Sequence, residues 1–284
     1  MVEFFQALAD PDAAFLRYAF VTGLLASVAF GMMGTYVVAR RISFIAGAIS
    51  HSVLGGIGAS LYLQQVAGWQ WCHPMVGAVF SALAAAVIIG IVTLRARQRE
   101  DTVIGAIWAI GMAAGLLFIA KTPGYFDAMS YLFGNILLIS RGDLWLVLAL
   151  DVLVVVIAIV FYNRLLAVCF DEEFARVRGV NVEFYYLLLL CLTALTIVLL
   201  VRVVGIVMVI ALLTLPAAIA GQLSRQLWQM MLIAILLCVL FVAVGLGVSY
   251  AHDLPSGPTI IAIAGLVYLA SLALGRAIRS RGCP

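Results

Sequence analysis

Apolar residues occur along this chain in runs of roughly 20, separated by short groups of charged residues, glycine and proline. A helix rises about 1.5 Å per residue, so a run of that length can cross the roughly 30 Å hydrocarbon core of a bilayer. The pattern predicts nine membrane spans, at about 14–38, 42–66, 73–94, 101–120, 143–163, 182–201, 204–221, 226–250 and 257–276. The seventh span is short and contains Pro216, so a count of eight full spans is the alternative.

The composition agrees with this pattern. The chain is 66% hydrophobic and only 10% charged, which is more apolar sequence than the core of a soluble domain needs. We therefore expect an all-α, polytopic transmembrane helical bundle that forms a single domain over residues 1–284. The first dozen residues contain Glu3, Asp10 and Asp12 but no Lys or Arg, unlike the start of a cleaved signal peptide. The first apolar run is therefore expected to remain as a membrane helix.

Basic residues are divided unequally between the two sides of the predicted bundle. With the N-terminus outside and the C-terminus in the cytoplasm, most of the 16 Lys and Arg residues lie on the cytoplasmic side, namely Arg40, Arg41, Arg95, Arg97, Arg99, Arg164, Arg176, Arg178, Arg225, Arg276, Arg279 and Arg281. This excess fits the positive-inside rule and gives the orientation that we expect. The basic residues are scattered at helix ends and form no patch, so they indicate no nucleic-acid partner.

Two connections are too long to be simple turns. On the outer side, residues 124–143 are expected to form a short amphipathic helix at the membrane surface, with Asp127 near its start. On the inner side, FDEEFARVRGV at 170–180 has acids first, arginines later and a glycine after them: Asp171, Glu172, Glu173, Arg176, Arg178 and Gly179. This order suits the dipole of a short helix that stops at the glycine. A solvated surface helix and a docking helix for a cytoplasmic partner both fit it.

The chain contains no recognisable nucleotide site. The nearest approach to a P-loop is GLLFIAKT at 115–122, which surrounds the only lysine but has Ala120 where a second glycine is required. There is also no HExxH motif, and Asp151 is the one clear acid deep in a predicted span. Since Asp151 has no visible partner in the sequence, it is either functional or hydrogen-bonded to a neighbouring helix.

His51 is predicted near the middle of the second span, roughly 14 Å along the helix from its cytoplasmic end. Gly47 and Gly55 lie four residues to either side, so the three share one helix face that is nearly bare apart from the imidazole. Small residues at this spacing favour close helix packing, with the histidine hydrogen-bonded between helices. The alternative is that the face borders a transport path, where a neutral imidazole offers a nitrogen ligand to a divalent cation.

Two weaker candidates lie nearer the C-terminus. Asp253, next to His252 in AHDLPSG, is a candidate cap for the last span or for the Pro-Ser-Gly turn. Pro216 frees backbone carbonyls that need a partner, which indicates a helix distortion and leaves a role in shaping a gate open.

Six sequence blocks follow one another between about residues 30 and 275: ISFIAGAISHSVLGGIG, REDTVIGAIWAIG, MSYLFGNILLIS, DEEFARVRGV, RVVGIVMVIALLTLPAAIA and YAHDLPSGPTI. In this order they resemble the membrane (permease) subunits of the zinc/manganese/iron (metal-chelate) family of ABC importers. The resemblance implies a homodimeric permease in the bacterial cytoplasmic (inner) membrane, separate cytoplasmic ATPase subunits and an extracytoplasmic metal-binding protein. It implies no permanently bound cofactor and no enzymatic activity in this chain, since a divalent metal ion is the transported substrate.

The resemblance also assigns residues. The segment at about 171–179 becomes the coupling helix that seats in the ATPase. His51 becomes a candidate metal ligand, and His252, Asp253 and Asp127 become candidates for an outer metal site that faces the binding protein. Members of this family typically carry an aspartate at the position of Gly47, so this chain lacks that carboxylate. The choice among zinc, manganese and iron stays open. The alternatives are a permease of the same architecture for a metal chelate or another small solute, and a secondary transporter driven by an ion gradient.

Overall fold

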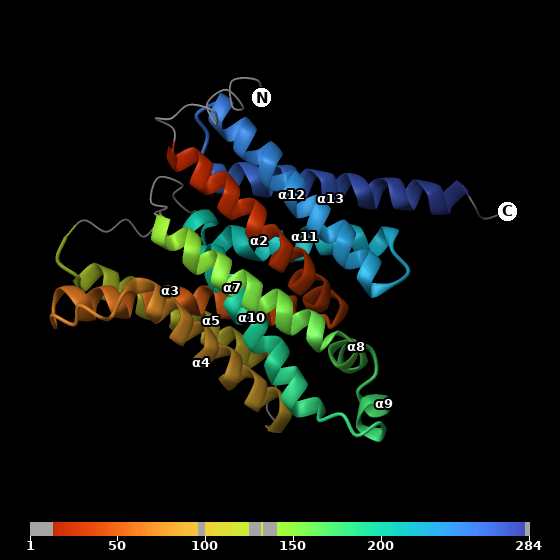
Figure 1. Cartoon of the computed structure of the whole chain (residues 1–284), viewed down its shortest axis with the longest axis horizontal. Coiled ribbons are helices and arrows are strands. Elements are labelled where there is room, and N and C mark those ends of the chain that lie inside the picture. The colour runs from red at the N-terminus through yellow and green to blue at the C-terminus, as the bar shows by residue number, and fades with distance from the viewer. Residues whose placement is uncertain (1–13, 96–99, 125–131, 133–140, 282–284) are drawn as a thin grey trace.

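The computed structural model describes residues 14–95, 100–124, 132 and 141–281, and this part of the chain is built of α-helices without a strand (Figure 1). The helices are α2 (Ala14–Ala39), α3 (Ser43–Gln65), α4 (Pro74–Arg95), α5 (Glu100–Lys121), α7 (Arg141–Val160), α8 (Tyr162–Phe170), α9 (Glu172–Val177), α10 (Val182–Val204), α11 (Ile206–Leu223), α12 (Leu227–Ala251) and α13 (Ser256–Arg281). Each of the nine predicted spans coincides with one long helix. The predicted all-α membrane bundle is confirmed.

Eight of the described helices are long and apolar enough to cross a membrane. The fifth predicted span corresponds to α7, which forms a pair with α8 that is bent by 71° at Phe161. Taken as one broken span, this pair raises the count within the described residues to nine. The doubtful seventh span is α11, a helix of 18 residues that includes Pro216.

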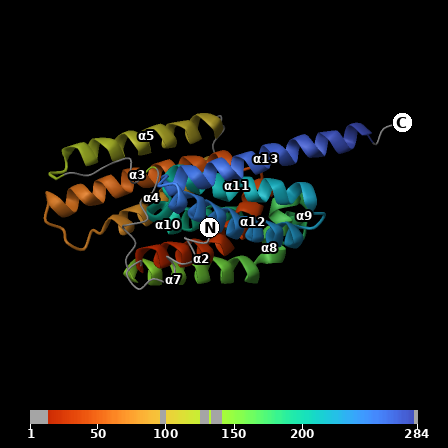
Figure 2. The ribbon, with the colours of Figure 1, turned by 90° about the horizontal axis from the view of Figure 1, so that it is seen from above.

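The helices form a bundle in which α2 lies between α7 and α12 (Figures 1 and 2). α2 packs against α7, α10, α11 and α12, while α3 packs mainly against α4 and α5. Seen from above, α5 and α7 lie at opposite edges of the bundle (Figure 2). α13 contacts α11 and α12 and extends beyond them at one side (Figure 1).

The passage from α10 to α11 uses a single residue, Gly205. Its φ of +84° is a conformation that glycine adopts without the steric cost that a Cβ atom would bring. Within α11, Pro216 lacks the N–H group that would bond the carbonyl of Leu212. The Cys238 thiol of α12 donates to this carbonyl at a distance of 3.6 Å. The carbonyl freed by the proline therefore has a partner on a neighbouring helix.

Candidate functional site

The imidazole of His51 lies inside the bundle, near the middle of α3. The side chain is 9% exposed, and its Nδ1 atom is buried without a hydrogen-bond partner. The ring stacks on the indole of Trp108 from α5, with 4.4 Å between ring centroids and 18° between ring planes. Phe44 of α3 also belongs to this group, because its ring centroid lies 5.8 Å from that of Trp108. His51 is therefore held by aromatic contact, and its nitrogen remains without a polar partner.

The bare face of α3 is a helix contact. A Cβ atom at Gly47 would lie 2.8 Å from Cζ3 of Trp108, and one at Gly55 would lie 2.9 Å from the carbonyl oxygen of Gly111. Because α5 occupies the space of both missing side chains, the close-packing interpretation describes this face correctly. The hydrogen bond to a neighbouring helix that this interpretation expected for His51 does not form through Nδ1.

The other polar side chains around His51 bond within α3 itself. Ser50 donates to the carbonyl of Gly47 at 2.8 Å, and Ser52 donates to the carbonyl of Ile49 at 2.7 Å. Such local bonds satisfy the hydroxyl protons inside the helix. Neither serine hydroxyl therefore donates to the imidazole.

The outer candidates do not meet His51 in one cluster. His252 is the C-terminal cap residue of α12, and the following Asp253 has a φ of +51°; both side chains are exposed. In the described residues no backbone N–H of a helix end donates to the Asp253 carboxylate, so nothing there supports its expected capping role. Asp127 lies outside the described residues. In the described part of the chain, no group of three or more His, Cys, Asp or Glu side chains is placed to hold a metal ion.

Asp151 is buried on α7, with a side-chain exposure of 6%. It lies beside the backbone of Ala29 in α2, and its Oδ1 atom has no hydrogen-bond partner. Since α7 and α5 lie at opposite edges of the bundle, Asp151 faces a different helix interface from that of Trp108 and His51 (Figure 2).

The predicted short helix at 171–179 is α9. Asp171 caps it, with Oδ1 accepting from the backbone N–H of Phe174 at 2.9 Å. The helix ends before Gly179, whose φ of +76° suits a glycine that follows a helix. Glu172 forms an ion pair with Arg40, which follows α2 and precedes α3. The sequence identified α9 and its stop at the glycine, but it gave no signal for a pairing with a residue more than a hundred positions away.

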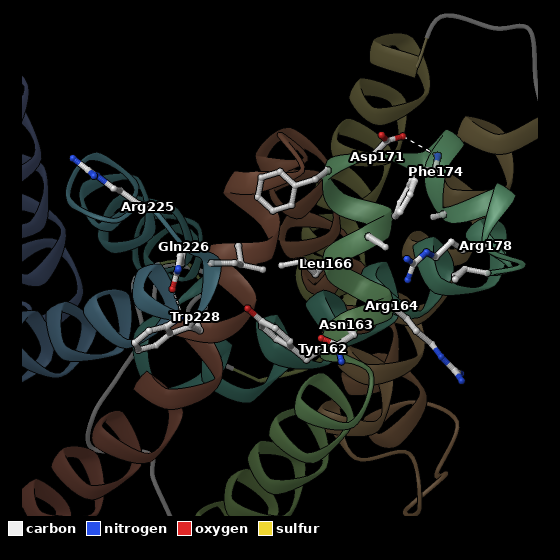
Figure 3. Close-up of a pocket in the computed structure, with 15 residues that line it drawn as sticks. Tyr162, Asn163, Arg164, Leu166, Asp171, Phe174, Arg178, Arg225, Gln226 and Trp228 are labelled. Atoms are coloured by element: carbon white, nitrogen blue, oxygen red, sulfur yellow. Dashed lines mark hydrogen bonds between the residues drawn. The ribbon is translucent and has the colours of Figure 1, made fainter.

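A pocket of about 980 Å³ lies beside α9 (Figure 3). Its walls come from α8, from α9 and from the start of α12, and include Phe170, Phe174, Arg178 and Trp228. The Arg178 guanidinium lies 5.0 Å from the centroid of the Phe174 ring and is turned toward the pocket. The pocket joins the short helix to the connection between α11 and α12, which carries Arg225.

Comparison with known proteins shows what this architecture is similar to. The sequence profile of the ABC 3 transport family matches residues 12–275. The chain is 42% identical to a probable metal transport system membrane protein of Chlamydia pneumoniae, over 89% of this chain and 86% of that protein. It is 31% identical to the manganese transport system membrane protein MntC of Listeria innocua, over 89% and 88% of the two chains.

A solved structure gives the same result. PsaBC from Streptococcus pneumoniae, in complex with a Fab, contains a chain that is 28% identical to this one and superposes with a TM-score of 0.84. The match covers 95% of this chain and 94% of that one. On the profile match and on these relatives, the chain belongs to the ABC 3 transport family, as a multi-pass inner-membrane subunit that is a transport component and not an enzyme.

Proposed function

We propose that this chain is the permease subunit of an ATP-driven importer that moves divalent metal ions inward across the cytoplasmic membrane. The family match over residues 12–275 carries the proposal, and relatives named for metal and manganese transport support the substrate class. Separate cytoplasmic ATPase subunits hydrolyse ATP, and an extracytoplasmic binding protein delivers the ion. The N-terminus lies outside and the C-terminus in the cytoplasm, as the distribution of arginines indicates.

The ATPase contacts the permease at α9 and at the pocket beside it. Val177 in α9 is 87% exposed and Phe174 is 51% exposed, although both are apolar and lie outside the long helices. Exposed apolar side chains next to a pocket are typical of an interaction surface. The guanidinium of Arg178 at its edge adds a charged contact. These features support the assignment of 171–179 as the coupling helix.

The same helix is linked to α3. The ion pair between Glu172 and Arg40 joins the first turn of α9 to the short connection that leads into α3. Arg40 also lies 5.6 Å from the ring centroid of Tyr186 in α10, which holds its guanidinium in place. A displacement of α9 by the ATPase therefore acts on the helix that carries His51.

His51 is the ligand that the ion meets inside the membrane. The buried Nδ1 atom has no hydrogen-bond partner, which lowers the stability of the fold. Imidazole nitrogen is a common ligand of divalent metals, so a bound ion would supply the missing partner. His252, Asp253 and Asp127 form a separate outer site that receives the ion from the binding protein, and a second copy of the chain supplies a further ligand at His51. A homodimer is supported by α5 and α13, in each of which only 17% of the span is buried within one chain.

The proposal is tested with the purified permease and its ATPase in proteoliposomes, loaded by the cognate binding protein. We expect uptake of a divalent metal that requires ATP, continues after ionophores collapse the ion gradients, and stops with a hydrolysis-deficient ATPase. Uptake that depends on a gradient and not on ATP would identify a secondary transporter. ATP-driven uptake of a metal chelate but not of free ions would identify the second candidate, which is favoured by the absence of a three-ligand cluster from the described residues.

A further inference from the structure

Trp108 stands where a second ligand of the ion at His51 would be placed. Its indole stacks on the imidazole at 4.4 Å and also fills the space beside Gly47, one helical turn before His51. A side chain at position 47 would be 2.8 Å from the indole at its first atom. The position one turn from the imidazole is therefore closed to a carboxylate as long as Trp108 is present.

In the described part of the chain, the helices that pack against α3 carry few acids, and these stand at helix starts. α3 and α4 contain no Asp or Glu, and the acids of α5, Glu100 and Asp101, stand at its first two positions. Asp101 precedes Trp108 by seven residues, or roughly 10 Å along the helix. α10 and α11 also pack against α3; α11 has no acid, and the one acid of α10, Glu183, lies in its first turn. Among the described helices that pack against α3, none therefore carries an Asp or Glu beyond its first turn.

The turn of α5 that precedes Trp108 is open. α5 is attached almost entirely through α3, with a smaller contact to α4. Gly105 lies one turn before Trp108 on the same face, and nothing lies within 4 Å of the position that a side chain there would take. Because side chains on a helix lean toward its N-terminus, the open turn at Gly105 is the one toward which the Trp108 side chain leans.

Resting on the proposed function, in which the ion passes His51, we propose that Trp108 determines which ion is accepted. Its indole covers the imidazole and takes the space beside Gly47, so that an ion meets nitrogen and an aromatic face without a carboxylate. Imidazole suits Zn²⁺, whereas carboxylate and other oxygen ligands suit Mn²⁺, and affinities for nitrogen-containing sites rise from Mn²⁺ to Zn²⁺. This position therefore favours Zn²⁺ over Mn²⁺, even though several relatives are named for manganese.

The intrinsic fluorescence of Trp108 reports on this contact directly. The other four tryptophans are about half exposed or more and can be replaced by phenylalanine without disturbing the core: Trp69, Trp71, Trp145 and Trp228. The full-length single-tryptophan permease in nanodiscs is titrated with ZnCl₂ or MnCl₂ alone. We expect a saturable change in emission with a midpoint for Zn²⁺ at least about tenfold lower than that for Mn²⁺. The change should disappear in His51→Leu, which keeps the bulk next to the indole and removes the nitrogen.

A second pair of substitutions tests the selectivity in transport. Trp108→Ala with Gly47→Asp removes the indole and places a carboxylate in the space that it leaves. In proteoliposomes with the ATPase and the binding protein, this variant should raise the ratio of Mn²⁺ to Zn²⁺ uptake by about tenfold over the parent chain.

Equal midpoints for the two ions in the titration, a response that persists in His51→Leu, no saturable response, or an unchanged uptake ratio would each overturn the role of Trp108. If one of these results is found while the parent chain still takes up both ions in the same proteoliposomes, only the role of Trp108 fails and the proposed function stands. If the parent chain takes up neither ion, the proposed function itself fails.

Discussion

Single polar groups inside this bundle differ in whether a neighbouring helix supplies a partner. The carbonyl of Leu212, left free by Pro216, accepts from the Cys238 thiol of α12. Nδ1 of His51 has no partner, although it is buried. Because an unpaired buried polar atom costs free energy, the first arrangement contributes to stability, while the second lowers it. Our proposal that His51 is a metal ligand accounts for this second arrangement.

Replacing Cys238 should show what the contact with Leu212 contributes. Cys238→Val leaves the carbonyl without a donor and should destabilise the permease by about 1 kcal/mol. Cys238→Ser keeps a donor of similar size and should melt close to the parent chain. Thermal unfolding in detergent measures both. Equal melting temperatures for the valine variant and the parent would show that the thiol is a packing atom only.

At this scale the sequence predicted positions better than contacts. It placed Gly47, His51 and Gly55 on one face, and the structure confirms that small residues there allow close packing. It did not predict that Trp108 stacks on His51, because that contact depends on how α5 is rotated about its own axis and where it crosses α3. A tryptophan in the middle of REDTVIGAIWAIG was the available signal, since a large ring needs an unusually small partner.

The contact between α3 and α5 is the element on which the proposed site depends. Backbone approaches backbone there, as at Gly55, where a Cβ atom would lie 2.9 Å from the carbonyl oxygen of Gly111. Small residues on both helices let van der Waals packing hold helices together in a membrane, where no hydrophobic force drives them together. The attachment of α5 to α3 therefore depends on these glycines.

Alanine at Gly55 should separate the two helices. The added methyl group meets backbone that cannot turn aside, and overpacking of this kind costs about 1–3 kcal/mol. Gly105→Ala on α5 is the matched control, because open space surrounds that position and alanine favours the helix. Thermal unfolding should therefore show a lower midpoint for Gly55→Ala and an unchanged or higher one for Gly105→Ala. The reverse order would contradict the packing described.

The ion pair between Arg40 and Glu172 is the other element-scale link. Arg40→Glu places two acids side by side and should reduce metal uptake while ATP hydrolysis continues, because α9 loses its connection to α3. Combining Arg40→Glu with Glu172→Arg restores a pair of opposite sign and should recover most of the uptake. The measurement is uptake per ATP hydrolysed in proteoliposomes. An unchanged ratio in Arg40→Glu alone would remove this link from the account.

Arg176 tests docking separately from that link. Its side chain is exposed and has no ion pair in the described part of the chain, so Arg176→Glu leaves the contact between Arg40 and Glu172 intact. We expect it to weaken co-purification of the ATPase with a permease that remains folded in the membrane. Full retention of the ATPase would exclude Arg176 from the contact.

The whole molecule was predictable in outline. Span positions follow from length and hydropathy, which local sequence contains, and all nine coincide with helices. The bend between α7 and α8 was not predicted, because the apolar sequence continues through Phe161 without proline or glycine at the break. The structure brings three connections that carry arginines to the same end of the bundle. Arg40, before α3, pairs with Glu172 of α9, and Arg225, before α12, lines the same pocket as Arg178, after α9.

The positions of the arginines predict that the end of the bundle that carries α9 and the connection between α11 and α12 faces the cytoplasm. In a chain without its native cysteines, a cysteine at Gln226 should react only with reagent on the cytoplasmic side. A cysteine at Gln70, which is exposed between α3 and α4, should react only from outside. The opposite labelling pattern would reverse the orientation.

The central claim, that an imported metal ion passes His51, is tested most directly by metal uptake in His51→Leu. Leucine keeps the bulk against Trp108 and removes the nitrogen, while His51→Ala removes both. In proteoliposomes with the ATPase and the loaded binding protein, uptake should fall by about tenfold or more in both variants, with expression and ATPase binding unchanged. If His51→Leu takes up metal as well as the parent chain, His51 is a packing residue and the ion follows a path lined by other groups.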